Sequence, residues 1–186
     1  MFVSTERYDT FILSYDISKG EIVTEAGGNI ADRISRQTEK GQLAVVDPDS
    51  KLVCLHTHIG NIKLIPLDFS QSHTSSSSSS STVSNSSLAH PKEMKEAFNI
   101  KIEELCIHDI AFIHASPLPH PVLAILYQDS KENRHLKTYQ VLTKEKELRE
   151  GPWNLFHTER SASSLIPVPA PTGTISHYYD SESYYF

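Results

Sequence analysis

Short apolar runs of five to eight residues recur along this chain, and turn-forming residues separate them. The runs are residues 10–15, 21–25, 42–46, 52–56, 62–67, 99–105, 107–114, 122–127, 135–142 and 163–168. Between them stand sequences such as Asp47-Pro48-Asp49-Ser50 and Ile59-Gly60-Asn61, which favour tight turns. Helical periodicity is almost absent. The pattern therefore predicts an all-β fold, and by itself leaves open a sandwich, a barrel or a propeller.

One segment does not fit this pattern. Residues 69–95 are poor in core-forming side chains and include seven consecutive serines at 75–81. Such a segment buries too little apolar surface to offset its conformational entropy, so we predict a disordered Ser-rich loop insertion. A tolerated linker and a phosphorylated serine tract are both compatible with it. The rest of the 186-residue chain divides into residues 1–68 and 96–173, with a tail at 174–186.

Composition narrows the classes of function. A mean hydropathy of -0.34 and the lack of a long apolar run indicate a protein without a membrane span. The N-terminal sequence lacks the basic and apolar regions of a secretory signal, so an intracellular location is expected. With 17 basic against 23 acidic side chains, the net charge is -6. That sign disfavours direct binding to DNA phosphates.

Cysteines and histidines invite a metal or redox interpretation. Cys54 and Cys106 lie in predicted strands without close Cys-x-x-Cys spacing and are interpreted as buried thiols. His56 and His58 share one face of a strand, but no third ligand stands at diagnostic spacing. We therefore predict no metal and no cofactor, and assign this pair to packing or surface. Three further histidines are expected to face water beside turns: His114, His120 and His135.

Catalytic patterns are also missing. Asp47 and Asp49 belong to a turn, while Glu103 and Glu104 are adjacent on a predicted strand and should point in opposite directions. No GxSxG elbow or phosphate-binding glycine loop is present. The sequence predicts that the chain is not an enzyme. Trp153, in Gly151-Pro152-Trp153, is predicted to anchor the core at a chain reversal.

Several motifs together resemble one family. They are Gly28-Asn29, Asp32-Arg33-Ile34, Arg36, Glu39, Gly41, Asp47-Pro48, Gly60, residues 63–68, KEAFNIKIEEL at 95–105, LYQDSKENRHLKTYQV at 126–141 and EGPW at 150–153. In this order they resemble the large subunit of the damaged-DNA-binding protein, the adaptor of cullin-4 ubiquitin ligases. Related architecture occurs in large subunits of a splicing factor and of the cleavage and polyadenylation factor.

The resemblance selects one fold. It covers part of the family's first β-propeller and implies a partial propeller, an open arc of about two to three four-stranded blades. The Ser-rich insertion would lengthen a loop that relatives keep short. The Tyr-rich tail at 174–186 diverges where the family would continue into another strand.

The charged loop at residues 27–40 is the predicted recognition segment. Its candidate protein-binding residues are Asp32, Arg33, Ile34, Arg36 and Glu39. Loops on a rigid β scaffold commonly carry binding, and in the family such a loop lies near the pocket for substrate-receptor proteins. Ser35 and Gln37 replace the glycine and proline that are usual in the family. A solvated loop held by local ion pairs is the alternative.

The resemblance implies a function without catalysis. It implies a protein-interaction scaffold linked to DNA damage recognition, repair and ubiquitination through partner proteins, in the nucleus and cytoplasm. Substrate receptors of cullin-4 ligases would be the partners, and the cullin contact would lie outside this part of the family. Two alternatives stay open: an RNA-processing scaffold, and a truncated product without independent function.

Overall fold

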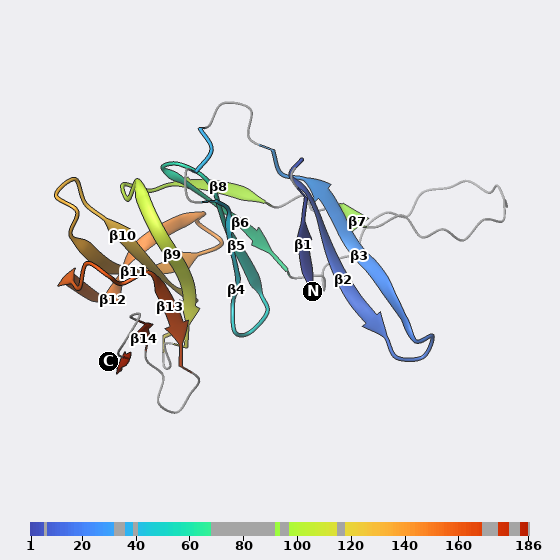
Figure 1. The fold of residues 1–186 in the computed structure, drawn as a ribbon. Coiled ribbons are helices and arrows are strands. Elements are labelled where there is room, and N and C mark those ends of the chain that lie inside the picture. The colour runs from blue at the N-terminus through green and yellow to red at the C-terminus, as the bar shows by residue number, and fades with distance from the viewer. Residues whose placement is uncertain are drawn as a thin grey trace, which may run out of the picture. The chain divides into compact units, whose positions relative to one another are not determined.

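The computed structural model describes residues 1–5, 7–31, 36–38, 41–67, 92–93, 97–114, 118–168, 175–178 and 183–185. All regular structure among these residues is β (Figure 1). The chain forms two compact units: unit 1 is Met1–Ile34 with Asp68–Ala97, and unit 2 is Ser35–Leu67 with Phe98–Phe186.

Unit 1 is built on a long hairpin. Its sheet has the order β1 (Phe2–Ser4), β2 (Asp9–Asp16), β3 (Glu21–Asn29) and β7 (Lys92–Glu93). Neighbouring strands are antiparallel except β3 and β7, which are parallel. Asp16 closes the β2–β3 turn, because its Oδ1 accepts hydrogen bonds from the Ser18 amide and hydroxyl. Gly20 takes a φ of 68° in this turn, which glycine adopts without steric cost.

The first sheet of unit 2 contains β4 (Leu43–Val46), β5 (Leu52–His58), β6 (Asn61–Pro66) and β8 (Phe98–Lys101), all antiparallel. The turn between β4 and β5 forms where Asp47-Pro48 predicts it. The Ser50 amide donates to the Asp47 carbonyl at 2.7 Å, and Ser50 has a φ of 57°. Every residue of β5 is buried, so this strand lies in the interior of unit 2.

Two more sheets complete unit 2. One holds β9 (Cys106–Ile113), β10 (Val122–Gln128), β11 (Arg134–Leu142) and β12 (Glu147–Thr158), and the other holds β13 (Ser164–Pro167), β14 (Ile175–Tyr178) and β15 (Ser183–Tyr185). Strands adjacent in sequence pair with one another in both sheets, which makes each an antiparallel meander.

The sheets of unit 2 pack side by side through their first strands. β9 contacts both β4 and β13 (Figure 1). One apolar cluster, which includes Leu64, Ile110 and Ile125, joins the first two sheets, and another, which includes Leu126 and Leu165, joins the last two. Four-stranded meanders packed through their first strands are propeller blades, and their series is open. The predicted all-β fold with propeller-type blades is confirmed.

One strand contradicts the sequence interpretation. Residues 147–158 form β12, the outer strand of its sheet, and Gly151-Pro152-Trp153 is a bulge in this strand instead of a chain reversal. These three residues stand opposite Thr138 alone. The Trp153 side chain is 48% exposed, so its predicted place in the core is wrong. An outer strand has no sheet beyond it to bury the indole.

The Ser-rich insertion at 69–95 lies outside the described residues except for β7 at Lys92–Glu93. Within the tail at 174–186 the described residues form β14 and β15, which extend the sheet that begins with β13. No helix long and apolar enough to cross a membrane occurs in the described part of the chain.

Candidate functional site

Of the predicted recognition residues the structure describes Arg36; Asp32, Arg33, Ile34 and Glu39 lie outside the described residues. Arg36 is exposed, and its carbonyl accepts a hydrogen bond from the Ile59 amide at 2.9 Å. Gln37 forms a β-bridge with His58, and the Thr38 amide donates to the Thr57 carbonyl. The end of this loop is therefore held against the end of β5, while its binding role stays a prediction.

The His56–His58 pair lies in the interior. The two residues are 2% and 4% exposed, and neither ring nitrogen of His56 has a hydrogen-bond partner. Burial, together with the nearby His58, lowers the pKa of His56 to about 4, so its imidazole is neutral at pH 7. The described residues contain no group of three or more His, Cys, Asp or Glu arranged to hold a metal ion. Packing is the role that this geometry gives the pair.

The cysteines differ from each other. Cys54 is fully buried on β5, and burial raises the pKa of its thiol, which disfavours the reactive thiolate. Cys106 is half-buried, so the predicted burial is complete for the first thiol and partial for the second.

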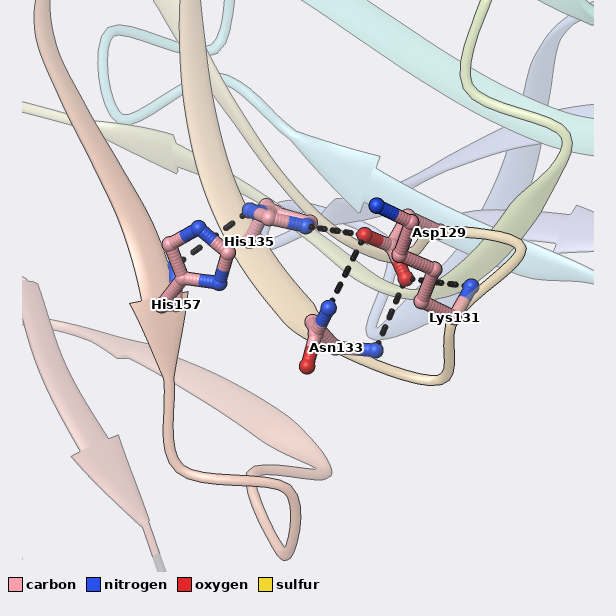
Figure 2. Close-up of polar contacts among 5 residues, drawn as sticks. All are labelled: Asp129, Lys131, Asn133, His135 and His157. Carbon is pink, nitrogen blue, oxygen red and sulfur yellow. Dashed lines mark hydrogen bonds and ion pairs between the residues drawn. The ribbon is translucent and has the colours of Figure 1, made fainter.

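A polar cluster at the β10–β11 turn is organised by Asp129 (Figure 2). Its Oδ1 accepts hydrogen bonds from the Lys131 and Asn133 amides, each at 2.8 Å. Its Oδ2 accepts from Asn133 Nδ2 at 3.2 Å and lies 3.1 Å from His135 Nε2. The hydrogen bond with His135 is the largest of the causes that lower the pKa of Asp129. The Asp129 carboxylate thus accepts the hydrogen bonds of backbone amides in the tight turn before β11.

His135 links this turn to β12. Its Nδ1 accepts a hydrogen bond from the His157 amide at 3.3 Å, which leaves Nε2 as the donor to Asp129 (Figure 2). His157 has a φ of 60° at an irregularity in β12. His135 is 6% exposed and stacks on Tyr127 at 5.2 Å, so the expectation that it faces water is wrong. Its ring is covered because β11 is an interior strand of the sheet.

This cluster resembles an acid–histidine pair but is built for structure. A general-base histidine needs one ring nitrogen on the orienting carboxylate and the other on the nucleophile. In His135 the second nitrogen is occupied by a backbone amide. Ser130, the nearest serine in sequence, therefore has no free imidazole nitrogen at His135 to activate it.

A second polar cluster surrounds Glu104. This residue follows β8, is 4% exposed, and its Oε1 accepts hydrogen bonds from Lys137 Nζ at 3.0 Å and from the Tyr139 hydroxyl at 2.7 Å. Burial and the bond to Glu104 raise the pKa of Tyr139 to about 12. Burial opposes the charge on Lys137, but its contacts with Tyr139 and Glu104 raise its pKa overall. Lys137 and Glu104 therefore form a partly buried ion pair.

The two clusters border one pocket of about 350 Å³. Its lining residues are Glu103, Glu104, Leu105, Tyr127, Gln128, Asp129, Ser130 and Lys137. The sequence pattern did not predict this site, because it placed Glu103 and Glu104 on a strand. In the structure β8 ends at Lys101, before both glutamates. Glu103 is exposed and Glu104 is buried. The spacing of Lys137 and Tyr139 on one face of β11 was the available signal, but nothing in the sequence pairs that face with Glu104.

Residues 1–181 match the family described as the RSE1/DDB1/CPSF1 first beta-propeller. The chain is 39% identical to "DNA damage-binding protein 1" of Oryza sativa subsp. japonica over 94% of its length. It is 40% identical to the protein of that name in Solanum lycopersicum and 39% identical to "DNA damage-binding protein 1b" of Arabidopsis thaliana. Each of these two alignments covers 92% of the present chain.

The aligned part covers 14% of the length of each of these relatives. The resemblance drawn from the sequence motifs is confirmed. Through the match to residues 1–181, the blade-like meanders of unit 2 and these identities, the chain belongs to the RSE1/DDB1/CPSF1 first β-propeller family.

Proposed function

We propose that this chain is a non-catalytic protein-interaction scaffold of the kind that serves as the adaptor of cullin-4 ubiquitin ligases. The observation that carries the proposal is the identity of about 40% to DNA damage-binding protein 1 over more than nine-tenths of the chain. Its link to DNA damage recognition, repair and ubiquitination runs through partner proteins, in the nucleus and cytoplasm.

The polar chemistry of unit 2 supports a scaffold. Both ring nitrogens of His135 and both oxygens of Asp129 are used within the fold. Lys137 is paired with Glu104, and an amine with a raised pKa is a poor nucleophile near neutral pH. His135, Asp129 and Lys137 are thus committed to holding turns and strands together.

The proposed partners are substrate-receptor proteins, bound through Asp32, Arg33, Ile34, Arg36 and Glu39. Arginines can make forked hydrogen bonds to carboxylates, and Ile34 adds a small apolar contact. The exposed position of Arg36 next to the anchored end of the loop is compatible with this role. The cullin contact belongs to parts of the relatives that this chain does not span.

Affinity purification of the tagged chain from cells tests the class of partner. Enrichment of substrate receptors, alone or with other cullin-4 ligase components, supports the proposal. Enrichment of spliceosomal or cleavage-factor subunits instead would move the chain to the RNA-processing branch. Recovery of neither class above an untagged control contradicts both assignments.

The recognition loop is tested by changing Arg33, Ile34 and Arg36 to alanine, singly and together. Receptor capture in a quantitative pull-down should fall severalfold in the triple variant, since each change removes a contact group. Arg149→Ala is the matched control, because Arg149 is an exposed arginine on β12. Unchanged capture in all loop variants would show that the loop is a solvated connection.

A further inference from the structure

The pocket beside Glu104 has unbalanced charge. Three of its lining residues are carboxylates, Glu103, Glu104 and Asp129, and one is an ammonium, Lys137. Burial, followed by the negative charge of Glu104, raises the pKa of Tyr127 in the same wall, as an acidic surrounding does. A cationic group would find a favourable field in this pocket.

The two oxygens of Glu104 differ in their partners. Oε1 accepts from both Lys137 and Tyr139, whereas Oε2 is buried and has no hydrogen-bond partner. A buried carboxylate oxygen without a donor is costly, because its hydration has been lost and nothing replaces it. Glu104 is 4% exposed, so water gives it little compensation. The site therefore lacks one hydrogen-bond donor.

None of the residues that line the pocket, Tyr127, Gln128 and Ser130 included, donates a hydrogen bond to this oxygen. Lys137 is engaged with Oε1 and lies 4.9 Å from the centroid of the Tyr139 ring. Asp129 cannot act as a donor when ionised, and both of its oxygens are held by the β10–β11 turn. A metal ion is disfavoured, because no group of three or more potential ligands is found among the described residues. The missing donor fits the cationic group of another molecule.

The rest of the wall selects the kind of cation. Leu105, next in sequence to Glu104, is 62% exposed and offers apolar surface to a methylene chain. Tyr127, which also lines the pocket, offers an aromatic ring. A guanidinium is planar and weakly hydrated, stacks on aromatic rings and donates up to five hydrogen bonds, so it can bridge two carboxylates. A lysine ammonium offers a more strongly hydrated point charge.

We propose that the pocket lined by Glu103, Glu104, Leu105 and Tyr127 binds an arginine side chain of a partner polypeptide, with the Glu104 carboxylate turning so that Oε2, buried in the free chain, accepts from the guanidinium. Glu103 is the second, exposed carboxylate of the site. The inference rests on the proposed scaffold function only in taking the ligand from a protein. It does not depend on cullin-4 ligase components or on the loop that contains Arg36.

The test is an NMR titration of the full 15N-labelled chain with N-acetyl-arginine amide. Saturable shifts should centre on the backbone amides of Glu104, Leu105 and Ser130. N-acetyl-citrulline amide has nearly the same shape without the charge and should bind about tenfold more weakly or worse, since it loses the charge-assisted bond. N-acetyl-lysine amide should also bind more weakly than the arginine compound. Equal binding of the citrulline compound, or shifts centred elsewhere, would overturn the proposal.

Variants locate the binding group. Glu104→Gln keeps the shape of the side chain and should weaken arginine binding about tenfold. Glu103→Gln, at an exposed position, should weaken arginine binding about two- to fivefold. This variant still tests the site if the Glu104→Gln protein does not fold. Glu159→Gln is the control at an exposed carboxylate outside the pocket. Unchanged arginine binding in the folded pocket variants would refute the site, as would the same shifts on adding calcium chloride alone.

Discussion

His56 is a titratable side chain that the fold keeps uncharged. Its imidazole lies in the fully buried strand β5, and neither nitrogen has a partner. Burial and the neighbouring His58 lower its pKa from 6.5 to about 4. The unfolded chain therefore takes up a proton at a higher pH than the folded chain, and the free energy of unfolding must depend on pH.

Replacing His56 with leucine should remove that dependence. In the unchanged protein, His56 makes the free energy of unfolding fall as the pH drops below about 6.5, by at most about 1.4 kcal/mol per pH unit. This fall levels off near pH 4, where the folded chain also takes up the proton. Urea unfolding between pH 4.5 and 7.5 measures the slope for each variant. His114→Leu, at a partly exposed histidine, is the control. Parallel pH profiles for the unchanged chain and the His56 variant would contradict the assignment.

Thr138 on β11 stands opposite the bulge in β12 and packs closely against Gly151. The Thr138 hydroxyl donates to the Trp153 carbonyl at 2.5 Å and accepts from the Trp153 amide at 3.1 Å. The side chain thereby replaces backbone pairing that the bulge interrupts. A Cβ at Gly151 would lie 2.6 Å from the Thr138 carbonyl carbon, closer than real contacts allow.

Gly151→Ala should therefore lower the free energy of unfolding by about 1–3 kcal/mol, the usual cost of overpacking. Thr138→Ala in the same chain should not rescue it, because the Thr138 carbonyl carbon and oxygen also obstruct the new methyl group. Urea midpoints of the single and double variants measure this. Full rescue in the double variant would show that the side chain, and not the backbone, excludes the methyl.

At the scale of elements, β12 is the feature that sequence pattern handled least well, whereas the pairing of β6 with β8 agrees with the predicted loop insertion between them. β12 is a 12-residue outer strand, and its bulge and Pro152 interrupt an edge that could otherwise pair with another chain. β6 and β8 pair directly, from Asn61 with Lys101 to Leu64 with Phe98. Residues far apart in sequence thus close one antiparallel hairpin of unit 2.

Deleting residues 70–91 should leave the urea midpoint of unit 2 nearly unchanged. The β6–β8 pairs lie outside the deletion, β7 is retained, and the entropy of loop closure varies only with the logarithm of loop length. Trp153 is the single tryptophan of the chain and reports on unit 2 by fluorescence. A large fall in the midpoint would show that the Ser-rich segment stabilises the fold.

At the scale of the whole molecule, net charge sets the affinity for nucleic acid. The chain carries a charge of -6, and phosphate binding requires an excess of basic groups that releases counterions. We expect binding to intact or damaged duplex DNA no tighter than the micromolar range at physiological salt, measured by fluorescence anisotropy. A salt-sensitive complex at nanomolar protein would mean that the chain reads DNA directly. Any repair role would then no longer require a partner.

The sequence by itself determined the strands and turns, because alternating burial and turn residues such as Asp47-Pro48 and Gly20 are local signals. All ten predicted runs overlap observed strands. The short strands β1, β7, β14 and β15 fall in none of these runs. The sequence also missed β12, since Gly151-Pro152 has the same local chemistry in a bulge as in a turn. The residue motifs also identified the family.

Tertiary structure alone decided which side chains meet. Glu104 after β8 reaches Lys137 and Tyr139 on β11 across more than thirty residues of chain, and His135 is buried between Asp129 and the His157 amide. These pairings depend on how one sheet packs beside the next, and no local pattern encodes that. The unpartnered oxygen of Glu104 is a product of this packing, because burial removes water from a carboxylate that the fold supplies with donors on one side only.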